Sequence, residues 1–180
     1  MRSKATAMFL SALALAVGAA PLAAAGGGSV KCEITENGDS AFGELVLLDG
    51  DNEVARGECG QKAISAPAGT YTAVLSLDGA LDGPEQRKEL TVKAGATQQT
   101  KADFATGTLT VQIKREGRRA AGMAIVRRGG EQVGTLGSGV AARLSAGTYE
   151  VVVRYRAQTR EFKDVVVEAG QARSLDATFE

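Results

Sequence analysis

The chain has 180 residues, a length that allows one large domain or two small ones. It carries 21 lysines and arginines against 21 aspartates and glutamates, so no overall field favours nucleic acid or a membrane surface. Histidine is absent, which excludes Ser-His-Asp and Cys-His nucleophile systems and any zinc or copper site with imidazole ligands. Aromatic residues make up 4% of the chain and glycine occurs 23 times, a composition typical of an all-β protein with glycine at its turns.

The first 25 residues have the pattern of a cleavable secretory signal. Arg2 and Lys4 form a positively charged start, residues 8–17 form a short apolar core, and residues 23–25 are three alanines. The apolar core is shorter than the roughly 20 residues that a membrane-spanning helix needs. We therefore expect a soluble protein, periplasmic or secreted, that does not span a membrane after cleavage.

Cys32 and Cys59 are the only two cysteines of the chain. In an oxidising compartment an isolated pair most often forms one disulfide. Closing a loop of this size would stabilise the fold by roughly 3–4 kcal/mol. A redox or metal site is the alternative, but the pair lacks a C-x-x-C spacing and a histidine partner. The two cysteines therefore predict a structural disulfide.

Beyond the signal, short segments with alternating apolar residues are separated by turns rich in glycine. In the first half these segments lie at residues 30–35, 44–49, 53–59, 62–65, 70–78, 87–93 and 98–104. In the second half they lie at residues 108–115, 122–128, 131–136, 140–144, 148–156, 161–168 and 172–179. Seven short strands at regular spacing are typical of an antiparallel sandwich. We predict an all-β fold with two tandem seven-stranded antiparallel β-sandwich domains, Ig-like or prealbumin-like, at residues 26–105 and 106–180.

One stretch occurs once in each half, as PAGTYTAVL at residues 67–75 and SAGTYEVVV at residues 145–153. Internal repetition of this kind indicates two copies of one architecture. Alternation along the strand places Tyr71 and Tyr149 on its buried face. The linker between the copies is only Ala105-Thr106-Gly107, so we expect the two domains to sit end to end with a fixed contact.

The order of these motifs resembles the PEGA, carboxypeptidase-regulatory-like and collagen-adhesin B-type repeats, all variants of a transthyretin-like (prealbumin-like) sandwich. The resemblance rests on the Ala-Gly-Thr-Tyr strand, a further strand that ends at Ala169-Gly170-Gln171, and a final strand. The second copy, which opens with GTLTV at residues 107–111, matches more closely than the first, whose loop at residues 80–85 is longer. The resemblance implies a non-catalytic module that binds cell-surface partners or acts as a structural spacer. It carries over no functional residues, because the shared positions belong to turns and cores.

An acidic run, DGDNE at residues 49–53, is a candidate for a Ca²⁺ site. Its carboxylates are Asp49, Asp51 and Glu53, and clustered carboxylates can bind Ca²⁺. The side chains of Asp78, Asp82 and Glu85 would complete such a site only if the fold brought the two loops together. The alternative is a hairpin turn, for which Asp-Gly and Asn are favoured. We expect the turn and no cofactor, with Ca²⁺ as the alternative.

The two halves differ in charge. Residues 26–104 carry 7 basic and 13 acidic side chains, a net charge of −6, and residues 105–180 carry 12 basic and 8 acidic, a net charge of +4. The sequence predicts a basic recognition face in the second domain, formed by Arg127, Arg128, Arg154, Arg156 and Arg160. That face would meet a protein or another anionic component of the cell envelope, or the halves would associate head to tail. The alternative is that these arginines only prevent edge-to-edge pairing of solvated strands.

These observations predict an exported, non-enzymatic β-sandwich protein that acts as a binding or structural module of the cell envelope. A carbohydrate-binding module is the alternative, and Tyr155 and Phe162 are the few rings that could face a sugar. A hydrolase comes third, since it would need a pair of carboxylates that the sequence does not single out. Nucleic acid is not an expected partner, because the chain offers no aromatic stacking platform.

Overall fold

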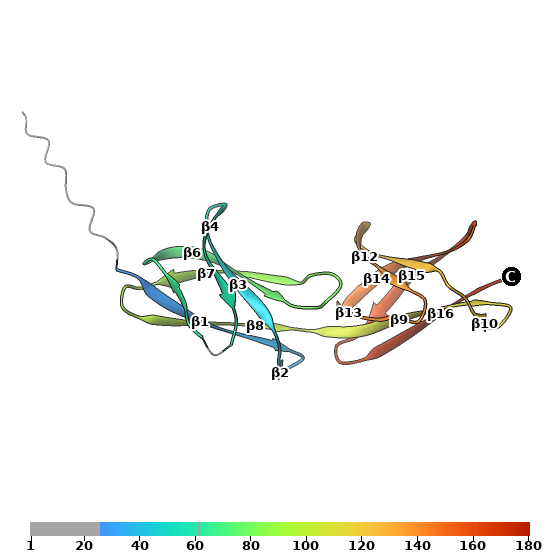
Figure 1. The fold of residues 1–180 in the computed structure, drawn as a ribbon, viewed down its shortest axis with the longest axis horizontal. Helices are drawn as coiled ribbons and strands as arrows, with labels where there is room; N and C mark the ends of the chain where they lie inside the picture. The colour runs from blue at the N-terminus through green and yellow to red at the C-terminus, as the bar shows by residue number, and fades with distance from the viewer. Residues whose placement is uncertain (1–25, 61) are drawn as a thin grey trace, which may run out of the picture.

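The computed structural model describes residues 26–60 and 62–180, so the predicted signal at residues 1–25 lies outside the described residues. Two β-sandwich domains follow one another along the long axis of the molecule (Figure 1). Across the described ranges, we find no helix with the length and apolar character needed to cross a membrane.

In the first domain, each of two sheets has four strands. In one sheet β1 pairs with β5 near its start, with β2 at its end and with β8 along most of its length. The second sheet has the order β4-β3-β6-β7. The strands are β1 (Gly28–Glu36), β2 (Asp39–Ser40), β3 (Gly43–Asp49), β4 (Asn52–Glu58), β5 (Ile64–Ala66), β6 (Gly69–Leu77), β7 (Glu85–Val92) and β8 (Thr97–Phe104).

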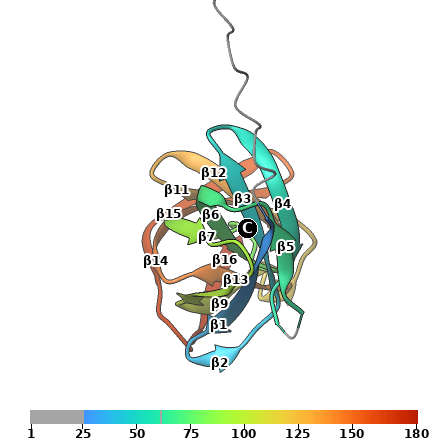
Figure 2. The same ribbon diagram turned by 90° about the vertical axis from the view of Figure 1, so that its left-hand side faces the viewer.

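The second domain repeats this topology strand for strand. In one sheet β9 pairs with β13 near its start, with β10 at its end and with β16 along most of its length. The second sheet has the order β12-β11-β14-β15. The strands are β9 (Thr106–Arg115), β10 (Arg118–Arg119), β11 (Met123–Arg128), β12 (Glu131–Gly137), β13 (Ala141–Ser145), β14 (Gly147–Tyr155), β15 (Gln158–Val167) and β16 (Ala172–Phe179). Seen along the long axis, the two domains lie one behind the other (Figure 2).

The predicted fold class is confirmed, and each predicted strand is present. The structure adds a two-residue strand to each domain, β2 and β10, which closes a short hairpin with the first strand. It also pairs the first and last strands of each domain in parallel, β1 with β8 and β9 with β16, whereas the remaining pairs are antiparallel. The chain starts each domain at one end and leaves it at the other, so its first and last strands run in the same direction.

The core of each domain lies between its two sheets and follows the predicted alternation. Leu45, Leu47 and Leu75 are fully buried in the first domain, and Ala124, Val126 and Val153 hold the corresponding positions in the second. Burial of aliphatic side chains on both facing sheets supplies the main stabilisation of such small sandwiches.

The repeated Gly-Thr-Tyr stretch closes the same corner in each domain. The Tyr71 hydroxyl donates to the carbonyl of Pro67 over 3.2 Å, and the Tyr149 hydroxyl donates to the carbonyl of Ser145 over 2.7 Å. A Cβ on Gly69 would lie 2.7 Å from the Tyr71 Oη, so the glycine of the motif leaves room for the hydroxyl. The motif is therefore structural, as its turn and core positions predicted.

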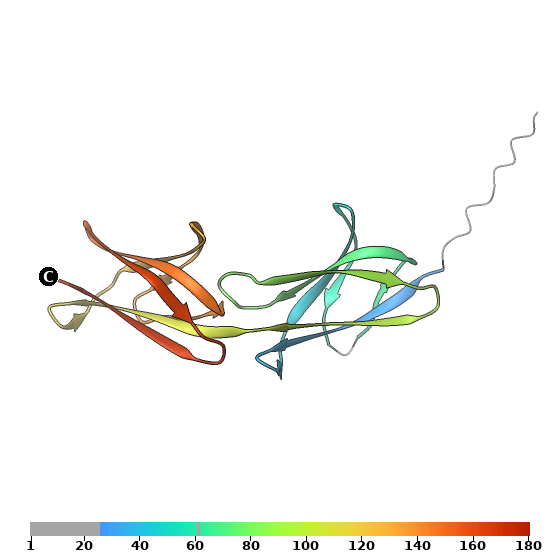
Figure 3. The same ribbon diagram turned by 180° about the vertical axis from the view of Figure 1, so that it is seen from behind.

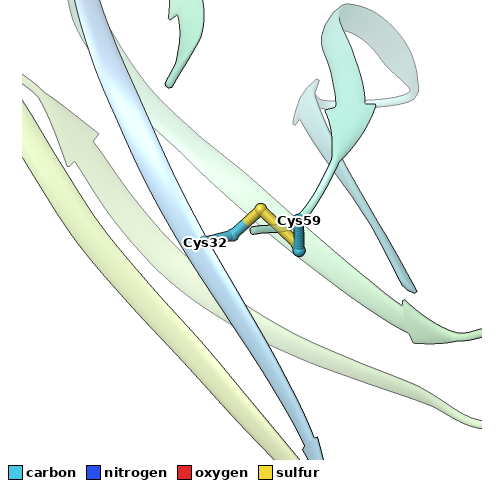
Figure 4. Close-up of a disulfide and its surroundings, with 2 residues drawn as sticks. All are labelled: Cys32 and Cys59. Atoms are coloured by element: carbon cyan, nitrogen blue, oxygen red, sulfur yellow. A yellow bond between two sulfur atoms is a disulfide. The ribbon is translucent and has the colours of Figure 1, made fainter. Parts of the chain in front are cut away.

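The predicted disulfide between Cys32 and Cys59 is present (Figure 4). Its Cα atoms lie 4.8 Å apart, and it joins β1 of one sheet to the residue that follows β4 of the other. Cys32 is buried in the first core. The bond therefore links the two sheets across the interior of the first domain. The strands of this domain contain less valine than those of the second.

Candidate functional site

A single residue, Ala105, separates the last strand of the first domain from the first strand of the second. The two strands β8 and β9 form one long ribbon that runs through both domains (Figure 3). We call the end of a domain where its first strand begins the proximal end, and the end where its last strand stops the distal end. The distal end of the first domain contacts the proximal end of the second.

The turn between β1 and β2 clamps the linker. The side chain of Asn37 donates to the carbonyl of Thr106 and accepts from its N–H, each over 3.0 Å. The Thr106 hydroxyl donates to the carboxylate of Glu36, and Thr106 is only 2% exposed. Asn37 has a φ of 52°, a conformation that asparagine tolerates better than most residues. The start of β9 is thus fixed through both the backbone and the side chain of Thr106.

The loop between β6 and β7 reaches across to the second domain. The Leu81 N–H donates to the carbonyl of Arg143 over 2.8 Å, and the Leu81 side chain packs against the second core. A Cβ on Gly134 would lie 2.4 Å from the Leu81 Cγ, so this leucine fits directly over a glycine. The longer loop that distinguishes the first copy from the second is therefore a docking element.

Asp82, at the tip of this loop, is buried against the second domain, with a side chain only 5% exposed. Its carboxylate accepts from the Ser145 N–H over 3.1 Å and lies 3.0 Å from the Tyr149 hydroxyl. The guanidinium of Arg128 is 3.7 Å away and supplies the opposite charge. Burial, together with the charge of Asp82, raises the pKa of Tyr149 well above its usual range. A buried carboxylate with several partners of this kind favours one arrangement of the two domains.

A second ion pair lies beside the linker. Arg143 of the second domain is 2.7 Å from the carboxylate of Glu36 in the first, and it also donates to the carbonyl of Asp78. The Glu36 side chain is 15% exposed, so this pair is more shielded from solvent than a typical surface pair. Together with the clamp and the loop, it makes the junction a continuous contact between the domains.

The acidic run at residues 49–53 forms the hairpin turn between β3 and β4, with Gly50 at a φ of 60°. Glu53 accepts two hydrogen bonds from Arg56, over 3.0 and 2.8 Å, which lower the pKa of its carboxyl below the usual value. Asp82 is held by the second domain. Within the described residues, no group of three or more acidic or cysteine side chains is placed to hold a metal ion.

The five arginines of the predicted recognition face lie in three places. Arg128 belongs to the junction, where its guanidinium stacks on the Tyr149 ring with 5.5 Å to the centroid. Arg127 and Arg154 lie on the outer face of the β12-β11-β14-β15 sheet, and Arg127 is 3.8 Å from Glu150. Arg156 and Arg160 lie at the distal end of the second domain. The sequence pattern alone did not show this division, because it depends on how the strands pair.

Two neighbouring rings, tilted by 38° to each other, contact two arginines of the distal end. The rings of Tyr155 and Phe179 are 5.4 Å apart, with Arg156 over Tyr155 and Arg160 over Phe179. Phe162, by contrast, packs partly buried against the second core. Tyr155 and Phe162 therefore do not form the exposed pair of rings that a sugar-binding face would need.

Beside the rings of Tyr155 and Phe179 lies a hollow of about 560 Å³, which we call the distal arginine hollow. It is lined by Arg115, Glu116, Arg118, Arg119, Ala120, Ala121, Tyr155 and Arg156. Its lining thus contains four arginines and one glutamate, and an opening of this kind attracts anionic groups. Tyr155 raises the pKa of Arg115 further above its usual value, and the nearby carboxylate of Glu116 acts in the same direction with a smaller effect.

The hollow is formed by the β9–β10 and β14–β15 hairpins. The first has its turn at Glu116-Gly117, with φ values of 47° and 76°, and it places Arg115 opposite Arg118. The second places Arg156 just after β14. The pair Arg118-Arg119 is visible in the sequence, but its proximity to Arg156 depends on the fold.

No family model matches the chain, and no curated protein matches it either. Among solved structures, the minor pilin GBS52 of Streptococcus agalactiae is 11% identical with a TM-score of 0.42. The match covers 85% of this chain and 94% of the pilin chain. The TIE protein of Bacillus anthracis is 13% identical with a TM-score of 0.38, and the pilus adhesin SpaC of Lactobacillus rhamnosus GG is 12% identical with a TM-score of 0.31. These two matches cover 86% and 84% of this chain, which spans only about a third of each of those proteins, 34% and 31%. Likenesses this distant carry no argument about function.

Proposed function

We propose that the protein is an exported, non-enzymatic structural and binding module of the cell envelope, in the periplasm or outside the cell. In this role it is a rigid two-domain spacer whose basic second domain meets an anionic component or a protein of the envelope. The grouping with transthyretin-like sandwich repeats is part of the same proposal and rests on the shared sequence motifs.

The junction is the observation that carries this proposal. A rigid spacer must hold its two ends in a fixed relation. Here a single residue joins the domains, and Asn37, Glu36 and the buried Asp82 of the first domain bind residues of the second. Tandem domains joined by a flexible linker would move independently, which is the usual expectation for small polar interfaces. The disulfide in the first domain supports export, because such bonds persist in oxidising compartments.

The arginines of the second domain offer two surfaces for an anionic partner. One is the outer face with Arg127 and Arg154, and the other is the distal arginine hollow with Arg118 and Arg156. Guanidinium groups bind carboxylates and phosphates through paired hydrogen bonds.

A pull-down from envelope extract tests the proposal, with mature protein as bait at low and at high salt. One variant carries Arg127→Gln and Arg154→Gln, and the second carries Arg118→Gln and Arg156→Gln. We expect the wild type to retain a partner that is lost at high salt and lost from one of the two variants. If the wild type and both variants retain the same envelope partners, these arginines do not bind them. If the wild type retains no partner, the proposed binding role is wrong.

A further inference from the structure

The distal end of the second domain is built like the distal end of the first. In the first, the Asn37 N–H donates to the carbonyl of Phe104 over 2.9 Å, and in the second the Glu116 N–H donates to the carbonyl of Phe179 over 3.2 Å. Both residues of the turn at Glu116-Gly117 have positive φ values, as do both residues of the turn at Asn37-Gly38. The first of these two ends is the one that docks a following domain. The second presents a similar backbone surface, and among the residues that the structure describes no further domain lies on it.

The charges on this repeated surface are reversed. The strand pairs Glu36–Asp39 and Arg115–Arg118 occupy the same register in the two hairpins, so two acidic positions of the first domain become basic in the second. After the sixth strand of each domain, Arg156 likewise stands where the first domain has Asp78. The distal arginine hollow is thus the counterpart of the acidic side of the junction.

At the opposite, proximal ends, one position shows the same reversal. β3 and β11 share a bulge in the same place, after Leu47 and after Val126, and this register makes Asp49 the counterpart of Arg128. Arg128 faces the acidic distal end of the first domain at the junction. Asp49 and Asp51 are exposed, and neither has an ion-pair partner among the residues that the structure describes.

We propose that a second copy of the chain docks the proximal end of its first domain, with Asp49 and Asp51, on the distal arginine hollow. The contact would set carboxylates of a proximal end against guanidinium groups of a distal end, the opposite arrangement of charges to the junction, where Arg128 of the proximal end faces Asp82 of the distal end. Because the two surfaces differ, the association is head to tail and extends into an open chain of copies.

This contact is smaller than the junction inside one chain. β14 and β15 are joined by a short turn, with Tyr155 opposite Gln158, so the second domain has no counterpart of the loop that carries Leu81 and Asp82. The docking depends instead on exposed opposite charges, which salt screens. We therefore expect reversible association that is visible at low salt and high protein concentration.

Sedimentation velocity on purified mature protein tests this proposal without any envelope partner, so its outcome is separate from that of the pull-down. Wild-type protein is compared in about 20 mM and about 500 mM sodium chloride, over a wide range of concentrations. We expect larger species that grow with concentration in low salt and a monomer in high salt. A wild-type protein that stays monomeric at all concentrations in low salt would overturn the proposal.

Charge reversals identify the surfaces. One variant carries Arg118→Glu and Arg156→Glu, and the other carries Asp49→Lys and Asp51→Lys; each should weaken self-association at least about tenfold. A mixture of the two variants should associate again, because each distal end then meets a proximal end of opposite charge. The control carries Arg127→Glu and Arg154→Glu on the outer face, has the same net charge as the first variant, and should associate like the wild type. Equal weakening by the control, or a mixture that stays monomeric, would contradict the assignment of the surfaces.

Discussion

The carboxylate of Asp82 in the first domain lies 3.0 Å from the hydroxyl of Tyr149 in the second. Tyr149 also repeats the corner hydrogen bond that Tyr71 makes in the first domain, so the same motif serves the fold in one copy and the junction in the other. The difference comes from the loop at residues 80–85, which reaches the next domain. The longer loop of the first repeat is thus the contact that fixes the two repeats relative to each other.

Replacing Asp82 by alanine should weaken the junction. The change leaves the Ser145 N–H without its acceptor and Arg128 without its countercharge, so we expect the free energy of unfolding to fall by about 1–3 kcal/mol. Chemical denaturation measures this loss. Asp78→Ala in the same loop is the control, because only the backbone carbonyl of that residue takes part in the junction. Equal losses in the two variants would show that the Asp82 carboxylate does not hold the domains together.

Leu81 and Gly134 should be energetically coupled. Leu81→Ala removes a side chain that packs on the second core and should cost about 2 kcal/mol. Gly134→Ala places a methyl group where Leu81 lies and should cost about 1–3 kcal/mol. In the double variant the new methyl group has room, so the total loss should be smaller than the sum by at least about 0.5 kcal/mol. Strictly additive losses, measured by urea denaturation, would place the two residues apart.

Reduction of the disulfide should destabilise the protein. The bond closes a loop with a sequence separation of 27, and removing this constraint should lower the free energy of unfolding by about 3 kcal/mol. Thermal unfolding with and without a reductant measures the change. The control is Cys32→Ala with Cys59→Ala, which should unfold at the lower temperature and show no response to the reductant. An unchanged wild-type transition after complete reduction would contradict a structural role for the bond.

The carboxylate of Asp103 should make stability depend on acid pH. Its hydrogen bond from the Thr35 hydroxyl, over 2.6 Å, and then that from the Gly38 N–H lower its pKa below the ordinary 3.8. A lowered pKa in the folded state means that the stabilisation is present above pH 3.8 and is lost as the pH falls through the folded-state value.

Asp103→Asn should therefore melt below the wild type at neutral pH, and the two melting temperatures should converge toward about pH 2. Asp51→Asn, which lies at an exposed turn, is the control for removal of a carboxylate. A gap between Asp103→Asn and the wild type that stays constant or widens in acid would show that the two hydrogen bonds do not favour the ionised form.

Most strands could be predicted from the sequence, because alternation and glycine turns are local signals. The strand expected at residues 70–78 lies at Gly69–Leu77, whereas β15, expected from residue 161, begins earlier at Gln158. The short strands β2 and β10 escape prediction because two residues show no alternation. Their turns, Asn37-Gly38 and Glu116-Gly117, combine two positive φ values, and Asn-Gly is a strong hairpin signal that could have revealed the first.

The candidate site is harder to predict than the fold. Asp82 is a candidate metal ligand by sequence because acidic residues cluster near it, yet its partners are Ser145 and Tyr149, more than sixty residues away. The sequence gives the number of arginines but does not predict which of them lie together, since two different hairpins bring Arg115 and Arg156 to the same hollow. Long-range proximity of this kind depends on strand pairing across the whole domain, which no local pattern encodes.

Nuclear magnetic relaxation of the backbone ¹⁵N nuclei tests the rigid junction most directly. We would measure it on the mature protein in high salt, where copies do not associate. If the contacts of Asn37, Glu36 and Asp82 hold the domains together, both domains tumble with one common rotational diffusion tensor, as an elongated body does. Separate tensors for residues 26–104 and 106–180 would mean that the domains move independently, and the proposed role as a rigid spacer would be wrong.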